Sequence, residues 1–310
     1  MARFASSWKV FPVVWFTVSA LLASPIANTA TAGARRATAG TSRLEHIIVV
    51  ILENHAYTVR TQPYTKSLLA RGTEFTNSYA ITHPSLPNYL AFFSGSTQGV
   101  SSDACPPPGS PYSKENLGHA CEAAGLTWEA YSENLDKAGS GACSVGGGAY
   151  TRKHDPWTDF ANLNHQNERP YSDLAVDIAN GNLPNLAFVI PNNCDNSHDC
   201  SSSHADSWLA ANVPAMLKAL GPAGMLILTW DEDDHSAGNH ILTVFVGAPV
   251  KAGFQATQKV THYTILRSIC ESLGLAPFGS AASQGSIDNV WQDPTSVAAR
   301  SWGSVKTLYR

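Results

Sequence analysis

Residues 44–52 read L-E-H-I-I-V-V-I-L, an almost unbroken run of aliphatic and mostly β-branched side chains. A strand exposed on one face alternates apolar and polar residues, whereas a continuous apolar run is typical of a strand buried on both faces. Strands of that kind occur in parallel sheets that helices cover on both sides. The stretch therefore predicts an α/β protein built on a mostly parallel central sheet.

Apolar runs of strand length recur along the rest of the chain, with helical patterns between them. Strands are predicted at 73–79, 127–131, 183–190, 224–230 and 241–246. Helices are predicted at 64–71, 115–124, 173–180, 208–220 and 261–273, each followed by a glycine that can end a helix. Strands that alternate with helices predict a three-layer α/β/α sandwich.

The first 32 residues have the layout of a secretory signal peptide. Arg3 and Lys9 give a basic start, residues 10–23 are almost entirely apolar, and Ala30-Thr31-Ala32 offers a small-residue cleavage site. An uncleaved anchor stays an alternative, although the apolar run is short for a membrane span. We therefore expect a secreted protein with a signal peptide over 1–32, a flexible lead-in over 33–42, one folded domain over 43–280 and a tail over 281–310.

The overall charge excludes two classes of partner. Only 14% of residues are charged, and the formal net charge is −4. Nucleic acid would require a basic field, and anionic lipid would require a polybasic patch. No later stretch is long and apolar enough for stable membrane insertion. A phosphate-bearing substrate would therefore have to be held by a few local groups.

Six cysteines lie behind the predicted signal peptide, and an even number in a secreted chain suggests disulfides. Proximity in the sequence favours two pairs, Cys194 with Cys200 and Cys105 with Cys121, which leaves Cys143 and Cys270. A zinc site is the alternative, but the chain has no C-x-x-C spacing.

Polar side chains follow two of the predicted strands where they end. Glu53 and Asn54 come directly after residues 44–52, and Asp231 and Glu232 come directly after residues 224–230. Ligands of open α/β sheets bind at the carboxyl ends of the strands. Acids that converge there repel one another unless a hard cation lies between them. The alternative is that these are ordinary polar loops and surface charges.

Residues 82–89 read T-H-P-S-L-P-N-Y and offer a candidate nucleophile. Pro84 and Pro87 bracket Ser85, which predicts a stiff turn outside any regular helix, followed by a helix that opens near Asn88. A helix N-terminus favours an anion beside the serine hydroxyl, and the Asn88 amide could donate to the same anion. The alternative is a proline-rich surface loop in which Ser85 and Asn88 have ordinary turn roles.

Basic and histidine side chains supply further candidates. Residues 150–156 are the most basic short segment, and Lys153 and His154 within it suit a phosphate, unless the segment is a solvated charge run. His198 lies in the loop that a Cys194–Cys200 bridge would close. His240 precedes the strand predicted at 241–246.

The motifs V-V-I-L-E-N-H at 49–55, T-H-P-S-L-P-N-Y at 82–89 and T-W-D-E at 229–232 resemble those of a known family. That family is the secreted acid phosphatase and phospholipase C phosphoesterase family of the alkaline phosphatase superfamily. The closest similarity is to small bacterial secreted acid phosphatases, some of which act on phosphatidylinositol 3-phosphate. The resemblance extends from about His46 to Leu275, so it implies that 43–280 is a phosphoesterase domain with an alkaline-phosphatase-like fold.

The resemblance also implies roles for individual residues. The ligands of a divalent metal ion would be Glu53, Asn54, Asp231 and Glu232. The catalytic residues would be Ser85 as nucleophile, with Asn88, His198 and His154. The substrate-binding residues would be His83, Lys153 and His240. Two-metal members of the superfamily carry an Asp-x-x-x-His pair that has no clean copy here, so one ion or two remain open.

These expectations combine into a secreted, metal-dependent phosphomonoesterase that acts through a phosphoserine. Its substrates would be small phosphoesters or phosphoinositide head groups. A phospholipase C or phosphodiesterase with the same site is the nearest alternative. A non-catalytic secreted module that binds a metal or carbohydrate is the more distant one. The sequence leaves the metal's identity and the oligomeric state open.

Overall fold

The computed structural model describes Met1 and residues 43–292. The predicted signal peptide, the lead-in and the last part of the predicted tail therefore lie outside the described residues. Within residues 43–292, no helix combines the length and the apolar character that crossing a bilayer requires.

An eight-stranded sheet forms the centre of the fold, in the order β11-β2-β10-β9-β1-β8-β4-β7. Its bounds are β1 His46–Leu52, β2 Gly72–Phe75, β4 Trp128–Ser132, β7 Glu168–Pro170, β8 Leu186–Ile190, β9 Gly224–Trp230, β10 Thr243–Val246 and β11 Phe254–Ala256. Only β10 runs antiparallel to its neighbours, β9 and β2. The prediction of a mostly parallel sheet is confirmed.

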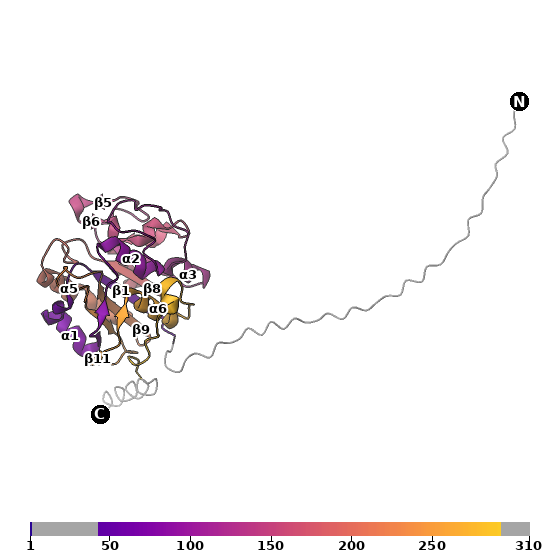
Figure 1. Cartoon of the computed structure of the whole chain (residues 1–310). Helices are drawn as coiled ribbons and strands as arrows, with labels where there is room; N and C mark the ends of the chain where they lie inside the picture. The colour runs from indigo at the N-terminus through magenta and orange to yellow at the C-terminus, as the bar shows by residue number, and fades with distance from the viewer. Residues whose placement is uncertain (2–42, 293–310) are drawn as a thin grey trace, which may run out of the picture. The chain divides into compact units, whose positions relative to one another are not determined.

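The strand that begins the domain shows why helices cover both faces of the sheet. Ile47, Val49 and Ile51 belong to one hydrophobic core, while the alternate residues Ile48 and Val50 belong to the other. The first core contains side chains from α2 (Ser85–Ser94), α3 (Leu117–Ala123) and α6 (His262–Leu273). The second contains side chains from α1 (Pro63–Arg71), α4 (Ser172–Asn180) and α5 (Ser202–Ala219). The three-layer sandwich is therefore confirmed (Figure 1).

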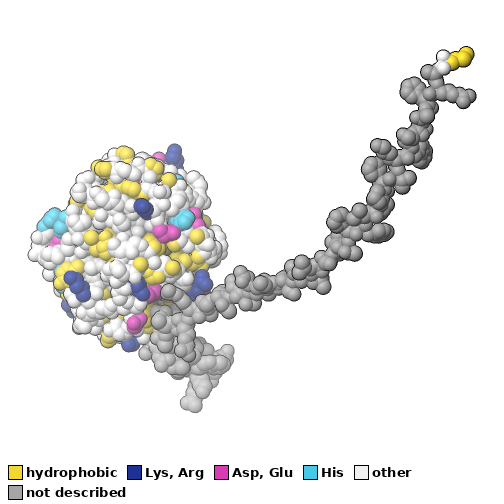
Figure 2. Space-filling view, turned by 45° about the vertical axis from the view of Figure 1, so that its right-hand side comes forward, with side chains coloured by type: hydrophobic (Ala, Val, Ile, Leu, Met, Phe, Trp, Pro, Cys, Tyr) yellow, Lys and Arg dark blue, Asp and Glu magenta, His cyan; other side chains and the backbone are white. Residues whose placement is uncertain are grey.

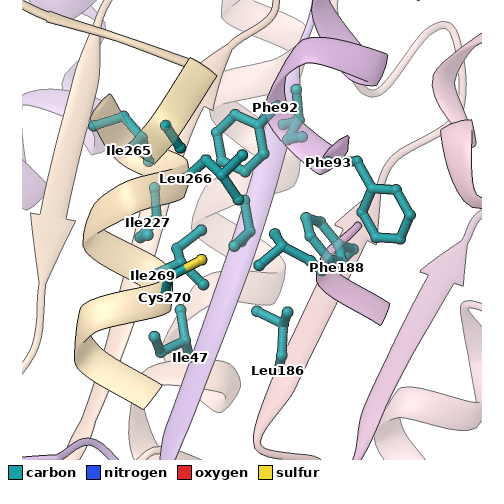
Figure 3. Close-up of a cluster of buried hydrophobic side chains, with 14 of the residues drawn as sticks. Ile47, Phe92, Phe93, Leu186, Phe188, Ile227, Ile265, Leu266, Ile269 and Cys270 are labelled. Carbon is teal, nitrogen blue, oxygen red and sulfur yellow. The ribbon is translucent and has the colours of Figure 1, made fainter. Parts of the chain in front are cut away.

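Helix α2 is anchored by aromatic packing, which fixes where its first residues lie. Figure 3 shows Phe92 and Phe93 of α2 packed with Phe188 of β8 and with apolar residues of α6. The rings of Phe93 and Phe188 meet edge to face, with their centroids 5.7 Å apart. Buried aromatic pairs of this kind add about 0.5–1.5 kcal/mol beyond their burial.

Some boundaries differ from the prediction. Helix α5 begins at Ser202, six positions earlier than expected, because the Ser201 hydroxyl caps it by accepting the backbone N–H of His204. The strand predicted at 73–79 divides into β2 and the short β3 (Ser78–Tyr79), which pairs with β12 (Val260–Thr261). The remaining short elements are β5 Ser144–Val145, β6 Tyr150–Thr151, η1 Tyr57–Thr61, η2 Gly146–Gly148, η3 Arg152–His154, η4 Pro156–Asp159, η5 His165–Asn167 and η6 Gly279–Ser283.

The described part of the predicted tail packs against the domain. Ile287 and Val290 are buried in the first core, and Trp291 pairs with Val250 as an isolated β-bridge. The Trp291 indole N–H donates to the carbonyl of Ile287 at 2.7 Å. The packed domain thus extends to at least residue 292.

Two disulfides are present, Cys105–Cys143 and Cys194–Cys200. The second was predicted, but the prediction of a Cys105–Cys121 pair is wrong. Cys121 faces inward from α3 and is buried in the first core, so Cys105 pairs with Cys143 from the loop before β5 instead.

Cys121 and Cys270 are expected to be unreactive thiols in the native protein. Burial raises the pKa of each thiol to about 12, so the nucleophilic thiolate is scarce at neutral pH. A thiol reagent should label no cysteine in the native protein and two after denaturation without reductant, with the labels located by peptide mass analysis. Four labelled thiols, or labels on Cys143, would contradict the pairing described here.

Candidate active site

The carboxylates predicted to converge do so because β1 and β9 are parallel neighbours. Leu52 of β1 is in register with Trp230 of β9, so Glu53 and Asp231 follow paired positions. The backbone N–H of Asp231 donates to the Leu52 carbonyl at 2.9 Å. The backbone N–H of Asn54, which has a φ of 53°, donates to Asp231 Oδ1 at 3.1 Å. The loop after β1 is thereby tied to the end of β9.

Ser85 is the first residue of α2, and Pro84 is its N-cap. The prediction that the two prolines keep Ser85 outside a regular helix is wrong. Pro87 fits in the first turn, where a backbone N–H has no partner within the helix in any case. The Ser85 hydroxyl is 1% exposed and donates to Glu53 Oε2 at 3.0 Å. The structure therefore brings together two of the predicted site residues that lie 32 positions apart.

Glu53 is the acid around which the site is arranged. Besides Ser85, its carboxylate accepts a short hydrogen bond from the Tyr89 hydroxyl, and its Oε1 lies 3.3 Å from His154 Nε2. Burial by itself would raise the pKa of Glu53, but His154 and Lys153 outweigh it and lower that pKa to about 2. Glu53 is therefore a fixed negative charge in the interior.

For Asp231 and Glu232, neighbouring groups do not offset the effect of burial on the pKa. Burial and the charge of Glu53 raise the pKa of Asp231 well above its usual value, and the same two causes raise the pKa of Glu232 to about 8. Asp231 Oδ2 is buried with no hydrogen-bond partner among residues 43–292. Three acids and an orphaned carboxylate oxygen are the surroundings that suit a divalent cation.

Two sets of side chains around Glu53 could hold that cation. The carboxylates of Glu53, Asp231 and Glu232 belong to the predicted set, and oxygen ligands suit a hard ion. Asn54, the fourth predicted ligand, contacts Asp231 through its backbone N–H, and a role for its side chain as a ligand stays a prediction. Glu53, His154 and His198 form the other, because they offer ligand atoms within 4.8 Å of one another, and imidazole ligands suit a transition metal. Both sets contain Glu53, so an ion bound by either set would lie beside the Glu53 carboxylate.

Loading that centre with a divalent ion is expected to release protons near neutral pH. In the metal-free protein the pKa of Glu232, raised to about 8, keeps a proton on this carboxylate at pH 7, and an incoming ion must displace it. The release should shrink as pH rises through about 8, because Glu232 becomes ionised over that range. Titration calorimetry with Mg²⁺, Mn²⁺ or Zn²⁺ in buffers of different ionisation enthalpy measures it. Proton uptake, or no proton exchange at pH 6.5, would contradict these protonation states.

Asn88 fastens the serine turn to the acids. Its side-chain oxygen accepts the backbone N–H groups of Ile81 and Thr82 at 3.0 and 3.1 Å. Its amide nitrogen donates to the Thr82 carbonyl at 2.8 Å and to Glu232 Oε2 at 3.1 Å. In this structure the amide therefore positions the turn, while a direct contact between Asn88 and phosphate stays a prediction.

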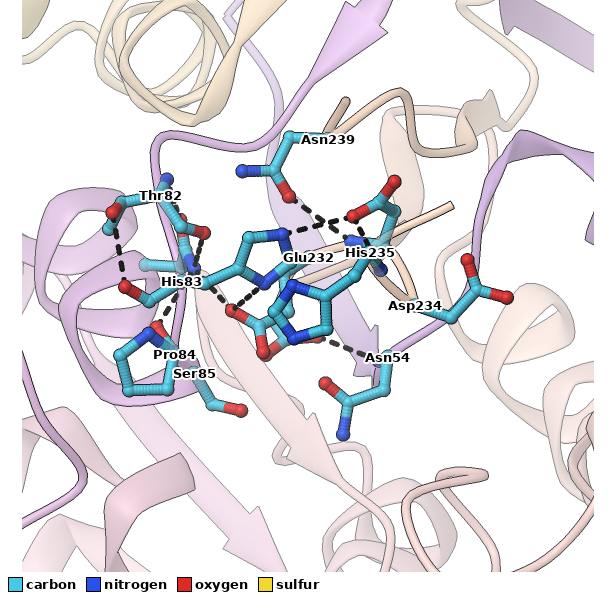
Figure 4. Close-up of polar contacts among 12 residues, drawn as sticks. Asn54, Thr82, His83, Pro84, Ser85, Glu232, Asp234, His235 and Asn239 are labelled. Atoms are coloured by element: carbon cyan, nitrogen blue, oxygen red, sulfur yellow. Dashed lines mark hydrogen bonds and ion pairs between the residues drawn. The ribbon is translucent and has the colours of Figure 1, made fainter. Parts of the chain in front are cut away.

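His83 lies between two carboxylates at the rim of the site (Figure 4). Its Nδ1 is 3.1 Å from Glu232 Oε2, and its Nε2 is 3.0 Å from Asp233 Oδ1. Its ring stacks on His235, with the centroids 3.9 Å apart. Burial and the neighbouring His235 lower the pKa of His83, although Asp233 opposes them.

Lys153 of η3 meets His198, which lies in the loop that the Cys194–Cys200 disulfide closes. Lys153 Nζ lies 3.0 Å from both His198 Nε2 and Asp103 Oδ2. His198 Nδ1 faces Asp199 Oδ1 at 2.6 Å, so these partners assign the Nδ1–H tautomer to His198.

His240 makes its contacts elsewhere. Its ring stacks between Tyr57 and Tyr79, with centroid distances of 4.4 and 5.1 Å, and its Nε2 is 3.1 Å from the Thr76 carbonyl. The structure thus shows His240 packed at the end of β3, and its predicted contact with substrate has no support among these interactions.

Several residues in contact with the site were missed by the sequence analysis. Asp103 contacts Lys153, and Tyr89 contacts Glu53. Buried His262 donates through Nε2 to the Asp231 carbonyl at 2.6 Å. Tyr89 lies four positions after Ser85 on α2, so helical spacing was a signal available for it. Asp103 and His262 lie in segments without any motif that pointed to the site.

The chain matches known phosphoesterases. The model of the phosphoesterase family matches residues 55–276. A phosphatidylinositol-3-phosphatase from Mycobacterium tuberculosis is 34% identical over 92% of this chain and 95% of its own length. An acid phosphatase from Aspergillus fumigatus is 27% identical, over 69% of this chain and 51% of its own length.

Solved structures agree on the fold. A protein of the alkaline phosphatase superfamily from Vibrio parahaemolyticus superposes with a TM-score of 0.60 at 11% identity, covering 79% of this chain and 71% of its own. Murine ectonucleotide pyrophosphatase/phosphodiesterase 5 superposes with a TM-score of 0.53 at 10% identity, over 81% of this chain and all of its own. The chain therefore belongs to the phosphoesterase family, whose members hydrolyse phosphoric esters, and it has an alkaline-phosphatase-like fold.

Proposed function

We propose that the protein is a secreted, metal-dependent acid phosphatase that hydrolyses phosphate monoesters, phosphoinositide head groups among them, through a phosphoserine at Ser85. One observation carries the proposal. The Ser85 hydroxyl, at the N-terminus of a ten-residue helix, is hydrogen-bonded at 3.0 Å to the buried carboxylate of Glu53. A nucleophile beside a base and a helix N-terminus is the arrangement that phosphoryl transfer requires.

The first half of the reaction uses the groups around Ser85. Glu53 accepts the hydrogen bond of the hydroxyl and orients it. Ser85 Oγ attacks phosphorus as the bond to the leaving alcohol breaks, and the hydroxyl proton passes to Glu53 Oε2, which returns it to Ser85 when the phosphoserine is hydrolysed. The Leu86 N–H in the first turn of α2 and the Lys153 ammonium, both of which contact Asp103 in this structure, stabilise the phosphoryl oxygens once substrate binds. A divalent ion held by Glu53, Asp231 and Glu232 would supply charge neutralisation and a lowered hydroxyl pKa.

The departing alkoxide needs a proton, and His198 is the proposed donor. Its Nε2 faces the Lys153 ammonium at 3.0 Å, on the side away from Asp199. When the Lys153 ammonium turns from His198 Nε2 to the phosphoryl oxygens, Nε2 can carry a proton. His198 then gives this proton to the leaving oxygen and later accepts one from the water that hydrolyses the phosphoserine.

Two further observations bear on the finer parts of the proposal. The relative from M. tuberculosis, which this chain matches over nearly its whole length, is named as a phosphatase of phosphatidylinositol 3-phosphate. Two disulfides suit an oxidising compartment outside the cytosol.

A screen of phosphate release tests the proposed function. The purified protein is incubated at pH 4 to 9 with p-nitrophenyl phosphate, phosphatidylinositol 3-phosphate, bis-p-nitrophenyl phosphate and a phospholipid diester, with and without chelator. We expect hydrolysis of the monoesters, fastest below pH 7 and lost with chelator. Faster hydrolysis of the diesters would instead identify a phosphodiesterase or phospholipase C, and no hydrolysis with any added ion would refute the proposal.

A further inference from the structure

Asp103 contacts the start of α2 directly beside Ser85. Its Oδ1 accepts the backbone N–H of Leu86 at 2.9 Å, and its Oδ2 accepts Lys153 Nζ at 3.0 Å. A free N–H in the first turn of a helix and an ammonium group are the donors that bind phosphate oxygens in many proteins. Together, the Leu86 N–H and Lys153 Nζ define what we call the anion position.

The anion position belongs to the candidate active site. Leu86 is the residue after Ser85, so the N–H that Asp103 accepts lies one residue from the reacting hydroxyl. Lys153 Nζ also contacts His198, the proposed proton donor. Asp103 and Glu53 both raise the pKa of Glu232, which places the Asp103 charge near the acids of the site as well.

Asp103 is also free to leave this position more easily than the residues beneath it. Its side chain is 29% exposed, whereas that of Lys153 is 15% exposed and Glu53 is fully buried. It lies in the loop between α2 and α3, two residues before Cys105, whose disulfide to Cys143 ties this loop to the segment that carries Lys153. The carboxylate can therefore swing outward while the loop itself stays attached.

We propose that Asp103 is an internal competitor of the substrate: its carboxylate holds the anion position in the free enzyme, and the phosphoryl group must displace it. The inference rests on the proposed function and adds a residue that sets affinity for phosphate. A carboxylate and a phosphate dianion cannot share the position, because both are acceptors with the same sign of charge. Displacing Asp103 weakens the binding of substrate and of the phosphate product alike, so it affects KM and Ki more than kcat.

A purely structural role predicts the opposite result. If Asp103 serves only to cap α2 and to hold Lys153, its removal loosens the phosphate-binding groups and weakens affinity. The direction in which affinity for inorganic phosphate changes thus separates the two roles.

The experiment compares Asp103→Asn and Asp103→Ala with the wild type. Asparagine keeps an acceptor for the Leu86 N–H without the charge, and alanine removes both. The measurements are the Ki of inorganic phosphate and the KM and kcat for p-nitrophenyl phosphate. Ki and KM do not depend on the fraction of protein that is folded, whereas the apparent kcat does. We expect Ki and KM to fall about fivefold or more in both variants, with kcat within about twofold.

Asp234→Asn is the matched control. Asp234 is an exposed acid at the rim near Glu232, and its carboxylate accepts the backbone N–H of Ser236 rather than a group of the anion position (Figure 4). Asp234→Asn removes one negative charge from the same region, so it measures how much a change in net charge alone affects the binding of phosphate. We expect this control to change Ki less than twofold.

Unchanged or higher Ki values in both Asp103 variants, or a fall no larger than that of the control, would overturn the role of Asp103. That failure is distinct from the failure of the proposed function. A wild type that hydrolyses no phosphoester removes the proposed function and this inference together, whereas an active wild type with indifferent Asp103 variants removes only the inference.

Discussion

Ser85→Ala should lower the kcat for p-nitrophenyl phosphate by at least about 10³-fold while the fold persists. The variant removes one hydroxyl, which donates to Glu53 Oε2 at 3.0 Å. Without the Ser85 hydroxyl no phosphoserine can form, and only direct attack of water on phosphorus remains. Steady-state turnover is measured together with circular dichroism and the melting temperature.

Ser94→Ala is the control for this prediction. Ser94 is another buried serine of α2, and its hydroxyl donates to the Leu90 carbonyl at 2.7 Å, at the far end of the helix. It should keep full activity at a stability cost of about 1 kcal/mol. Acid quenching of turnover with labelled phosphate should leave label on the Ser85 peptide in the wild type and on none in Ser85→Ala. Near-normal turnover in Ser85→Ala, or label elsewhere, would show that another group attacks phosphorus.

Glu53→Gln should abolish the response of the protein to divalent ions and lower kcat by roughly 10²-fold or more, because a bound ion supplies several kcal/mol of charge stabilisation. The wild type should melt at a higher temperature with a saturating ion than with chelator, since a ligand that binds only the native state stabilises it. In Glu53→Gln this difference should nearly vanish. The metal-free variant should melt below the metal-free wild type, because the lowered pKa of Glu53 means that His154 and Lys153 stabilise its ionised carboxylate in the fold, and glutamine loses that contribution.

Glu74→Gln serves as the control for Glu53→Gln. Glu74 of β2 is also a buried glutamate, but its carboxylate accepts a hydrogen bond from Arg60 Nη2 at 2.9 Å. Among the interactions of residues 43–292, Glu74 contacts none of the proposed metal ligands. It should lower the melting temperature while leaving the effect of the ion and the activity in place. Bound metal is measured by mass spectrometry of the dialysed proteins. Equal metal content and equal ion-dependent stabilisation in Glu53→Gln and wild type would exclude Glu53 as a ligand.

The layers of the fold follow from the amino-acid pattern. The continuous apolar run of β1 has to bury both faces, and alternating helices are the only cover that the chain offers. The same pattern predicted that Glu53 and Asp231 lie close together, because residues that follow parallel neighbouring strands converge at one edge of the sheet. Ser85 could be found from its motif, although its place inside α2 could not, since a proline in a first helical turn reads locally as a turn.

The pattern does not say which distant loops meet over that edge, because this depends on how the whole chain packs. Cys105 pairs with Cys143 because the inward side of α3 buries Cys121, a preference that depends on which face of the helix meets the sheet. Asp103 lies on a loop without periodicity or motif, and its contacts with Leu86 and Lys153 join segments that are 17 and 50 residues away. Local sequence fixes strands and helices through spacing and burial, but the meeting of irregular loops depends on the whole packed chain.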